Sequence, residues 1–359
     1  MSATYDNAVI TVEVSESKLE EVKRVYKNVY YHPDENVPEE ELKVADIWFA
    51  TWTGLPTCVK SLDQIPNMKV LQLSSAGANK ALYSPIMSSD KARKQIKVCS
   101  SSGMHTLSIP QYIIGNVINL YMKLHIQLYI ARSQSVWPDR DEIVRLCGMS
   151  GQAFPGNRSV SGKTVGLLGY GHIARETARL FKAFNCSIIA ANSRGNRRPE
   201  EGYRIPGTGD ADGSIPEDYY STNDEQSFSS FLSRCDILVA SLPSTPQTIN
   251  MLSQKHLELL PHGSVLVNVG RGDLVKSESI LGALDAPKGL WGAVLDVTDP
   301  EPLTHGHPLY THPNVIVTPH TSGIIEGYFD VGADILIAQA AKLKQNEEPL
   351  NVVDPVKGY

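Results

Sequence analysis

The sequence lacks an excess of positive charge, a paired pattern of cysteines and a long uninterrupted hydrophobic run. A net charge of −6 gives no general electrostatic reason to bind nucleic acid or an anionic membrane, so we expect neither as a partner. The five cysteines are scattered, with no Cys-x-x-Cys pair, which favours reduced thiols in a cytoplasmic protein. Residues 113–131 look apolar, but Asn116, Asn119 and Lys123 interrupt them and favour a buried or interface helix. No targeting signal is visible in residues 1–7, and we expect no metal ion.

What the chain does have is enough length for two domains and a repeated alternation of strand-like and helix-like segments. Its 359 residues are 42% hydrophobic and 20% charged, which is ordinary for a folded globular protein. The alternation predicts an α/β protein with doubly wound parallel sheets. In the first part we expect strands at 8–14, 44–51, 69–73 and 97–100, with a helix at 16–30. In the second part we expect strands at 164–168, 186–191, 237–241, 264–269, 292–297 and 315–318, separated by helices at 173–184, 228–232, 253–260 and 277–284.

Three further segments do not follow this alternation. Residues 110–145 are expected to form one or two long helices, and 324–343 a final helix. The stretch 197–224 contains Gly, Pro, Asp, Ser and Tyr without a clear period, which predicts an inserted surface loop after the second strand of the nucleotide domain.

A dinucleotide fingerprint follows the strand expected at 164–168. Its Gly-x-Gly-x-x-Ala pattern spans Gly169, Tyr170, Gly171, His172, Ile173 and Ala174. Gly169 permits the tight turn, Gly171 allows close approach of a pyrophosphate, and Ala174 lets helix and strand pack closely. The following helix begins with unpaired N–H groups that favour phosphate. A tight turn without ligand is the alternative, since glycine turns before helices are common.

The residues after the next strand bear on which dinucleotide binds. An NAD enzyme usually carries Asp or Glu there, whereas this chain has Asn192, Ser193 and Arg194. The missing carboxylate removes repulsion toward a 2′-phosphate, and Arg194 can bind that phosphate through charge-assisted hydrogen bonds. We therefore expect NADP(H) in preference to NAD(H). The alternative is a solvated basic loop that includes Arg197 and Arg198.

Three chemically strong side chains each follow an apolar strand. Arg271, Glu301 and His320 are expected at the carboxyl edge of the sheet, where ligands bind in such folds. Together they suit carbonyl reduction: His320 gives a proton to the oxygen, Glu301 stabilises the imidazolium, and Arg271 binds a substrate carboxylate. Each residue alone also has a structural explanation, such as a loop cap, a turn or a buried histidine.

The motifs around these residues resemble those of the D-isomer-specific 2-hydroxyacid dehydrogenases. The matching motifs are Arg271-Gly272, Leu295-Asp296-Val297 with Glu301-Pro302, and Thr318-Pro319-His320. The resemblance covers most of the chain and is strongest over 161–323. It implies NAD(P)-dependent interconversion of a 2-keto acid and a D-2-hydroxy acid, with catalytic Arg271, Glu301 and His320. The Glu at 301 argues against the formate dehydrogenase branch, which has Gln there.

The resemblance also implies the domain layout, the partner and the binding residues. A flavodoxin-like substrate domain would comprise 1–109 and 324–359, with a Rossmann domain at 110–323 inserted and homodimerisation helices near 110–150. Asp296 corresponds to the residue that contacts the nicotinamide carboxamide. The implied substrate-binding residues are Ser75, Ala76, Gly77, Arg271 and His320. The implied cofactor-binding residues are Gly169, Tyr170, Gly171, His172, Ile173, Asn192, Ser193, Arg194, Leu242, Pro243, Val269, Gly270, Arg271, Asp296, His320 and Gly323.

Some features depart from the family pattern or leave alternatives open. The usual Val-Ala-Glu is Ile109-Pro110-Gln111, the usual Gly-Val-Asp is Gly77-Ala78-Asn79, and the 197–224 insertion is not typical. A dinucleotide-sensing binding protein like the corepressor relatives of the family would keep the same motifs, and so would an enzyme for another carboxylate, such as a phosphonate. The sequence does not name the substrate, whose selection we assign to side chains including Trp52, Leu55, Ser74, Tyr83 and Trp137.

Overall fold

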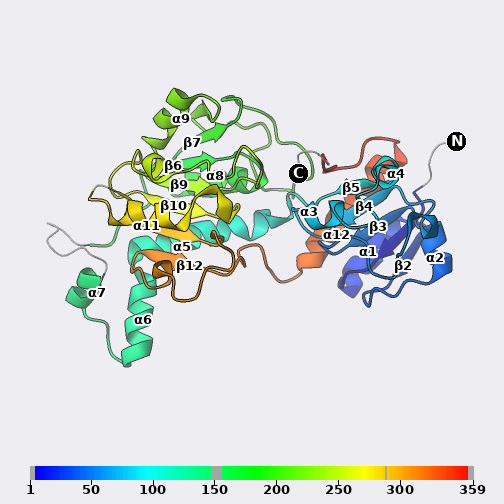
Figure 1. Cartoon of the computed structure of the whole chain (residues 1–359), viewed down its shortest axis with the longest axis horizontal. Coiled ribbons are helices and arrows are strands. Elements are labelled where there is room, and N and C mark those ends of the chain that lie inside the picture. Colours follow the sequence, from blue (N-terminus) through cyan, green and yellow to red (C-terminus); the bar gives the residue numbers. More distant parts are fainter. Residues whose placement is uncertain (1–4, 147–155, 288, 355–359) are drawn as a thin grey trace. The chain divides into compact units, whose positions relative to one another are not determined.

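The computed structural model describes residues 5–146, 156–287 and 289–354, and the chain divides into two compact units (Figure 1). Unit 1 consists of Met1–Met104, Glu201–Ile205 and Ile324–Tyr359, and unit 2 consists of His105–Glu200 and Pro206–Gly323. A short piece of the inserted segment thus belongs to unit 1. Cys147, one of the five cysteines, lies outside the described residues.

Unit 1 is built on a five-stranded parallel sheet in the order β2-β1-β3-β4-β5. This is the flavodoxin-like strand order, so the predicted doubly wound α/β fold is confirmed for this unit. The strands are β1 (Asn7–Ile10), β2 (Asn28–Tyr31), β3 (Ile47–Ala50), β4 (Val70–Leu73) and β5 (Lys97–Cys99). The helices are α1 (Glu16–Val25), α2 (Glu39–Val44), α3 (Asn79–Leu82), α4 (Asp90–Gln95) and α12 (Tyr328–Lys344).

The helix expected over 16–30 is too long, and the structure replaces its end by a strand. The helix α1 is capped by the Ser15 hydroxyl, which accepts a hydrogen bond from the Lys18 N–H at 3.2 Å, and it ends at Val25. β2 then pairs in parallel with β1 at the sheet edge. Its valine and two tyrosines favour extended backbone, but an edge strand of four residues has too short a pattern to be distinguished from a helix end.

The last helix, α12, packs along α1 within unit 1. The Tyr26 hydroxyl donates a hydrogen bond to the Leu336 carbonyl at 2.8 Å, and Lys18 Nζ lies 2.6 Å from Asp334 Oδ1. Apolar residues of α12 join those of β1 and β3 in one buried cluster. The final segment of the chain therefore covers one face of the N-terminal sheet.

Unit 2 is built on a seven-stranded parallel sheet in the order β12-β11-β10-β9-β6-β7-β8. The first strand of the unit, β6, lies inside the sheet with crossovers to both sides, as in dinucleotide-binding folds, so the second predicted sheet is also confirmed. Its strands are β6 (Thr164–Leu168), β7 (Ser187–Asn192), β8 (Asp218–Ser221), β9 (Ile237–Ala240), β10 (Val265–Asn268), β11 (Gly292–Leu295) and β12 (Val315–Val317). Its longer helices are α5 (Ile109–Met122), α6 (Leu124–Gln134), α7 (Arg140–Leu146), α8 (His172–Ala183), α9 (Glu225–Leu232) and α11 (Ser277–Asp285), with a short α10 (Gln254–Leu257).

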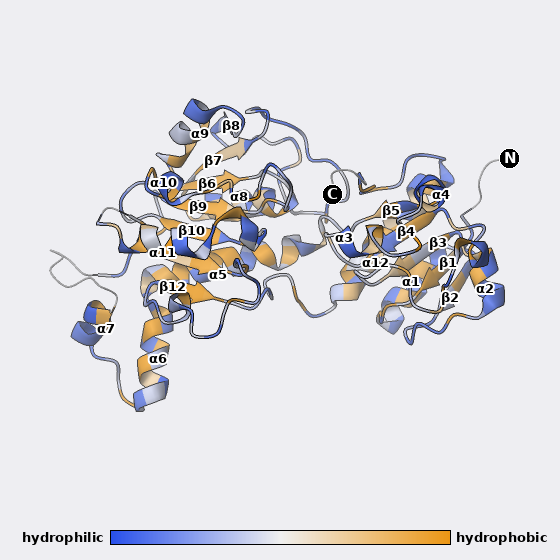
Figure 2. Ribbon diagram, viewed as in Figure 1, coloured by the Kyte–Doolittle hydropathy of each residue, from blue (hydrophilic) through white to orange (hydrophobic). Residues whose placement is uncertain are grey.

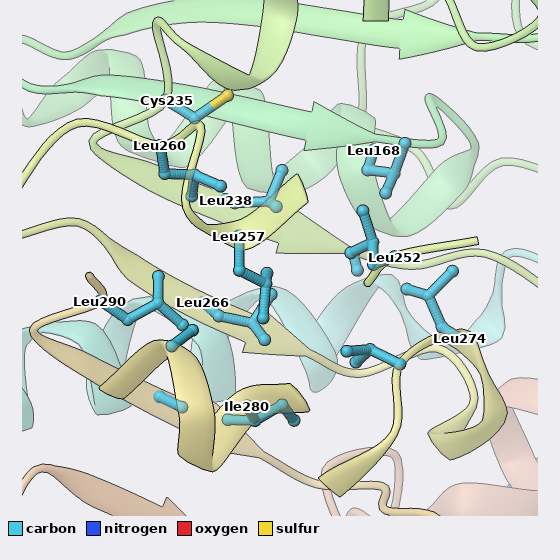
Figure 3. Packing of buried hydrophobic residues seen from close by; sticks show 14 of the residues in the cluster. Leu168, Cys235, Leu238, Leu252, Leu257, Leu260, Leu266, Leu274, Ile280 and Leu290 are labelled. Atoms are coloured by element: carbon cyan, nitrogen blue, oxygen red, sulfur yellow. The ribbon is translucent and has the colours of Figure 1, made fainter. Parts of the chain in front are cut away.

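Both faces of this sheet are buried, which explains the almost continuous apolar strands (Figure 2). Leu266 belongs to one hydrophobic cluster and its neighbour Val267 to another on the opposite face. Figure 3 shows Leu238, Leu257 and Leu266 packed together in the first of these clusters. The strand ends are therefore held in fixed positions, and the loops that follow them start from a rigid frame.

The inserted segment 197–224 was expected to be a loop, but its end forms the edge strand β8. β8 pairs with β7 through the register Ile189↔Asp218 to Asn192↔Ser221. Its residues are exposed or half-buried. A four-residue strand without a buried face carries no strong sequence period, which is why it was missed.

The expected helical stretch 110–145 forms three helices, of which α6 and α7 extend away from the sheet of unit 2 (Figure 1). The break after α5 falls at Lys123, which has a left-handed backbone with φ of 55°. Its buried ammonium group donates to the Gly156 carbonyl at 2.9 Å. Within the described part of the chain, no helix combines the length and apolar character needed to cross a bilayer.

Candidate active site

The three candidate catalytic residues follow three adjacent strands of unit 2. Arg271 comes after β10, Glu301 after β11 and His320 after β12, so all three start from the carboxyl edge of the sheet. His320 Nδ1 lies 2.7 Å from Glu301 Oε1, and the two side chains are 46% and 42% exposed. The carboxylate therefore fixes the orientation of the imidazole and leaves Nε2 as the ring nitrogen that can face a ligand.

Arg271 makes no hydrogen bond with His320. Its Nη1 donates to the Gly270 carbonyl at 2.7 Å, and the residue is otherwise exposed. The positive charges of Arg271 and His320 both act on His105 of the short 3-10 helix Met104–Leu107. His105 is therefore within the electrostatic influence of both candidate groups.

His105, which the sequence motifs did not indicate, is a residue on which the charges of both candidate groups act. Burial lowers the pKa of His105 to about 4, and the charges of Arg271 and His320 act in the same direction. A side chain at Gly323 would lie 3.1 Å from His105 Nδ1, so the glycine leaves room for this ring. His105 is thus neutral at physiological pH. The only indication of His105 in the sequence is its position shortly before the segment Ile109-Pro110-Gln111.

Asp296 binds the loop that carries His320. It lies directly after β11, and it is 2% exposed. Its Oδ1 accepts hydrogen bonds from the Thr318 hydroxyl at 2.6 Å and the Thr321 N–H at 2.9 Å. Its Oδ2 accepts from the Ser322 N–H at 3.0 Å and from the Ser322 hydroxyl. In this structure all hydrogen bonds of the Asp296 carboxylate go to the segment 318–322.

The fingerprint turn has the geometry of a phosphate cradle. Gly169 has φ of +86°, and a Cβ there would lie 2.8 Å from Leu242 Cδ2. A Cβ at Gly171 would meet nothing within 4 Å, and Gly171 caps α8 without any side-chain hydrogen bond. The first turn of α8 therefore presents its N–H groups to open space, which suits a pyrophosphate. Tyr170 is buried, whereas His172 and Ile173 are partly exposed at this turn.

The loops after β9 and β10 pack closely beside this turn. A Cβ at Gly270 would lie 2.5 Å from the Leu242 carbonyl oxygen, so only glycine fits between the two loops. The Thr248 hydroxyl donates to the Pro243 carbonyl at 2.6 Å and holds the loop after β9. Leu242, Pro243, Val269 and Gly270 thus lie together with the fingerprint at the carboxyl edge of the sheet.

The polar residues of the loop after β7 have different roles. Asn192 Oδ1 accepts from the N–H groups of Arg194 and Gly195 at 2.9 and 2.8 Å, so this side chain shapes the loop. The Ser193 carbonyl accepts a bond from Asn223 Nδ2 at 3.0 Å. Arg197 pairs with Asp212. The Arg194 guanidinium is exposed and makes no hydrogen bond or ion pair with any described residue, so it can meet a ligand.

The inserted segment folds back onto the fingerprint. The Tyr170 hydroxyl donates to Asp210 Oδ2 at 2.7 Å, and Arg175 Nη2 donates to the Arg198 carbonyl at 2.8 Å. Glu176 Oε2 accepts from the Gly209 N–H at 2.7 Å. His172 Nδ1 also lies 2.7 Å from Glu200 Oε1. The sequence did not indicate that Arg175 and Glu176 of α8 hold this segment. Both are charged, and each is only 4% exposed.

We expect Asp210→Asn to destabilise the protein by about 1–3 kcal/mol, because its buried carboxylate accepts backbone N–H bonds on both oxygens. Oδ1 accepts from Ser214 and Oδ2 from Ile215, each at 3.0 Å, so an amide NH2 must face one of these donors. Urea unfolding measures the change. Asp212→Asn is the control, since Asp212 is exposed, and an equal loss in both variants would contradict the anchoring role of Asp210.

The loop expected to bind the substrate carboxylate lies in unit 1, directly after β4. The Ser75 hydroxyl donates to the Gly77 carbonyl at 2.6 Å, and the Ser75 carbonyl accepts from the Ser101 N–H at 2.8 Å. Among the described residues, nothing accepts a hydrogen bond from the N–H groups of Ala76 or Gly77. Two neighbouring unused donors suit a carboxylate. No group of three or more His, Cys, Asp and Glu side chains in the described ranges is placed to hold a metal ion.

Comparison with known proteins identifies the family of the chain. Residues 137–322 match the family model for the NAD binding domain of D-isomer specific 2-hydroxyacid dehydrogenases. A protein of Corynebacterium melassecola, known only as an uncharacterized protein in the proB 3′ region, is 30% identical over 322 residues, which are 89% of this chain and 92% of that protein.

Solved structures share the fold over nearly the whole chain. A D-isomer specific 2-hydroxyacid dehydrogenase from Xanthobacter autotrophicus, in complex with NADPH and MES, has a TM-score of 0.70 at 20% identity, covering 99% of this chain and 100% of that one. An NADPH-dependent glyoxylate/hydroxypyruvate reductase from Sinorhizobium meliloti, in complex with NADP and sulfate, has a TM-score of 0.68 at 21% identity, with the same coverage. The chain belongs to the D-isomer specific 2-hydroxyacid dehydrogenase family, whose members are NAD(P)-dependent oxidoreductases.

Proposed function

We propose that this protein is an NADP(H)-preferring dehydrogenase that interconverts a 2-keto acid and the D-2-hydroxy acid, working mainly as a reductase. The observation that carries this proposal is the His320–Glu301 hydrogen bond of 2.7 Å at the carboxyl edge of a dinucleotide-binding sheet, from which Arg271 also starts. A proton donor, its orienting carboxylate and a carboxylate-binding guanidinium are the groups that reduction of a 2-keto acid requires.

In the proposed reaction each residue has a separate task. Bound NADPH supplies a hydride to the carbonyl carbon of the substrate. His320 transfers a proton from Nε2 to the carbonyl oxygen, and Glu301 stabilises the imidazolium through Nδ1. Arg271 binds the substrate carboxylate and polarises the carbonyl. Ser75, Ala76 and Gly77 of unit 1 are proposed, separately, as substrate-binding residues. One hydride and one proton thus convert the ketone to an alcohol, and His320 regains its proton from solvent.

The fingerprint and its neighbouring loops are the proposed cofactor site. Phosphate would lie at Gly171 and the first turn of α8, where the backbone is open. The other contacts that we propose are those of Gly169, Tyr170, His172, Ile173, Asn192, Ser193, Arg194, Leu242, Pro243, Val269, Gly270, Arg271, Asp296, His320 and Gly323. NADPH and NADP are present in the solved relatives from Xanthobacter autotrophicus and Sinorhizobium meliloti, which supports the same cofactor class here.

The reaction is tested with purified protein, NADPH and a panel of glyoxylate, hydroxypyruvate, pyruvate and aromatic 2-keto acids. We expect oxidation of NADPH with at least one of them and formation of the D-hydroxy acid. If no member of the panel is reduced, the proposed reductase activity is wrong.

Cofactor preference is tested at Arg194. We expect Arg194→Ala to raise KM for NADPH by about 10–100-fold, the effect of losing charge-assisted hydrogen bonds to a phosphate, and to leave KM for NADH unchanged. Arg197→Ala is the matched control, because Arg197 is already paired with Asp212. A larger effect of Arg197→Ala would place the 2′-phosphate on the other arginine.

We further propose a homodimer that uses α6 and α7. These helices carry exposed apolar residues, with Leu128 and Tyr129 on α6 and the 95%-exposed Trp137 on the connection to α7. Residues Ile126 and Ile130 form only a small cluster with α7, which leaves this surface without a large core of its own. Sedimentation tests the dimer, with twice the chain mass of 39.3 kDa expected.

We also propose a cytoplasmic location. It agrees with the free thiols of the four described cysteines, and cell fractionation tests it.

A further inference from the structure

The inserted segment is attached to both units of the chain. The chain passes from unit 2 to unit 1 before Glu201 and returns to unit 2 after Ile205, so the piece Glu201–Ile205, here called the strap, belongs to unit 1 while both of its flanks belong to unit 2. A domain inserted once into another needs only the connections at Met104–His105 and Gly323–Ile324. The strap is therefore an additional covalent connection between the units.

Within unit 1, the strap is held by the side chain of Asn351. The Tyr203 N–H donates to Asn351 Oδ1 at 3.1 Å. Asn351 Nδ2 donates to the carbonyls of Ser100 and Ser102 at 3.1 and 2.9 Å, and the Ser100 N–H donates to the Asn351 carbonyl at 3.0 Å. Asn351 has φ of 55°, a left-handed conformation that asparagine adopts more readily than most residues. One side chain thus joins the strap, the C-terminal segment and the segment that follows β5.

The strap also lies directly against the segment that follows β5. Gly103 has φ of +100°, and a Cβ there would lie 2.3 Å from the Tyr203 carbonyl oxygen, so only glycine fits at this position. The Tyr203 side chain is half-buried, and burial raises the pKa of its phenol. Gly103 directly precedes Met104, where the chain leaves unit 1 for the first time. The attachment of the strap to unit 1 is therefore next to the first connection between the units.

In unit 2, the two flanks of the strap are attached to the start of α8. Before the strap, Glu200 Oε1 lies 2.7 Å from His172 Nδ1, and the Glu200 N–H donates to the Ala211 carbonyl at 2.8 Å. After the strap, the Gly209 N–H donates to Glu176 Oε2 at 2.7 Å. The Glu200 side chain is 5% exposed and Glu176 is buried, so water does not compete freely for these attachments.

The lengths of the two flanks limit the distance between the attachments in the two units. Tyr203 comes three residues after Glu200, and an extended chain covers at most about 3.3–3.6 Å per residue, so this arm spans at most roughly 11 Å. Gly209 comes six residues after Tyr203, so the second arm spans at most roughly 22 Å. While both ends remain attached, the start of α8 cannot move farther than this from the segment that follows β5.

We propose that the strap restricts the motion of the two units relative to one another. Its effect reaches the candidate site through both attachments, because α8 begins at the fingerprint turn and the Ser101 N–H donates to the Ser75 carbonyl at 2.8 Å. The strap thereby limits how far the fingerprint can separate from the loop proposed to bind the substrate. This inference goes beyond the proposed function, since it concerns motion that occurs with or without a reaction.

Lengthening the strap without changing its attachments tests the proposal. In a slack variant, six Gly and Ser residues are inserted after Glu201 and six more after Pro206, both exposed positions. The added residues roughly double or triple each arm, so the attachments remain while the limit on their separation is removed. The control variant has six Gly and Ser residues inserted after Asp34, in an exposed turn of unit 1.

Single-molecule energy transfer between two dyes measures the motion. The dyes are attached to Lys23→Cys on α1 and Gln226→Cys on α9, which are exposed positions in unit 1 and unit 2. Cys58→Ser and Cys147→Ser prevent labelling elsewhere, and labelled subunits are mixed with an excess of unlabelled protein. We expect a narrow distribution of transfer efficiency in the wild type and the control, and a clearly broader one in the slack variant. An equally narrow distribution in the slack variant, or a broad one in the wild type, would overturn the proposal.

Substitutions in unit 1 test the attachment of the strap. Asn351→Ala removes the acceptor of the Tyr203 N–H, and Gly103→Ala places a methyl group against the Tyr203 carbonyl. We expect the Tyr203 amide to exchange with deuterium about tenfold faster in both variants, as for the loss of one hydrogen bond, and the energy-transfer distribution to broaden. Gly162→Ala is the control for backbone strain, because Gly162 has φ of +76° and a Cβ there meets nothing within 4 Å.

The two measurements separate attachment from restriction. Faster exchange at Tyr203 with an unchanged energy-transfer distribution would mean that the strap is attached without restricting the units, and the proposal would be wrong. Neither measurement uses a substrate. A protein that reduces no 2-keto acid would therefore contradict the proposed function, while a broader distribution in the slack variant would still support the role of the strap.

Discussion

Replacing His320 by Gln is expected to lower kcat for 2-keto acid reduction by about 10²–10⁴-fold, the usual contribution of a general acid. Gln is similar in size, and its amide can donate to Glu301 in place of the Nδ1–H, which is 2.7 Å away in the wild type. It has no group that releases a proton at neutral pH, so the carbonyl oxygen would go unprotonated. Initial rates with NADPH measure kcat, and fluorescence titration measures NADPH binding, which should remain nearly intact.

His305→Gln is the matched control for this substitution. His305 lies on the same connection between β11 and β12, and it is exposed. We expect wild-type activity from it. If His320→Gln loses NADPH binding together with activity, His320 is a structural residue, and the proposed proton donor must be sought elsewhere.

Replacing Arg271 by Lys is expected to reduce kcat/KM for a 2-keto acid by about 10²–10³-fold, comparable to losing one preorganised donor to a developing negative charge. Lysine keeps the charge but cannot present two parallel N–H groups to a carboxylate. The Arg271 guanidinium already donates through Nη1 to the Gly270 carbonyl at 2.7 Å, which orients it for this contact. Steady-state kinetics with a good keto acid measures the loss.

A substrate pair identifies the partner of Arg271. The wild type should strongly prefer the keto acid to its 2-keto amide, and Arg271→Lys should reduce that preference. An unchanged preference would mean that Arg271 does not bind the carboxylate. Arg93→Lys, at an exposed arginine of α4 in unit 1, is the control and should leave both rates unchanged.

Much of the fold and of the candidate site follows from local patterns. The apolar strands β6, β9, β10 and β11 are buried on both faces, so they are recognisable as continuous hydrophobic runs. The glycine turn after β6 could be recognised as a dinucleotide fingerprint. Gly169 is required there because of its positive φ and because Leu242 approaches closely. Arg271, Glu301 and His320 were found because each lies in a segment that follows an apolar strand.

The errors fall on elements whose stability comes from partners far along the chain. β2 and β8 are four-residue edge strands, and each is defined by its pairing to one neighbour more than by its own sequence. His105 is separated from Arg271 by more than half of unit 2, and only folding brings it within the electrostatic influence of Arg271. No local period or motif contains such information.

The inserted segment illustrates the same limit. Its lack of periodicity correctly indicated an irregular segment, but its attachment to the fingerprint depends on Asp210, Arg198 and Gly209 meeting residues at the start of α8. From the sequence alone, Arg175 and Glu176 are expected to be ordinary charged residues on the exposed face of a helix. Their burial arises only because a distant part of the chain covers them and supplies backbone hydrogen-bond partners.

By itself, the sequence determined the two parallel α/β sheets, the dinucleotide fingerprint and the order of the three motifs, because strand burial, glycine turns and short motifs are local properties of a chain. Only the tertiary structure decided that the Asp296 carboxylate accepts hydrogen bonds from the 318–322 loop, that the charges of Arg271 and His320 act on His105, and that the insertion is anchored to the fingerprint. These features depend on hydrogen bonds and charges between residues distant in sequence, and such pairs are defined only when the strands are brought into register.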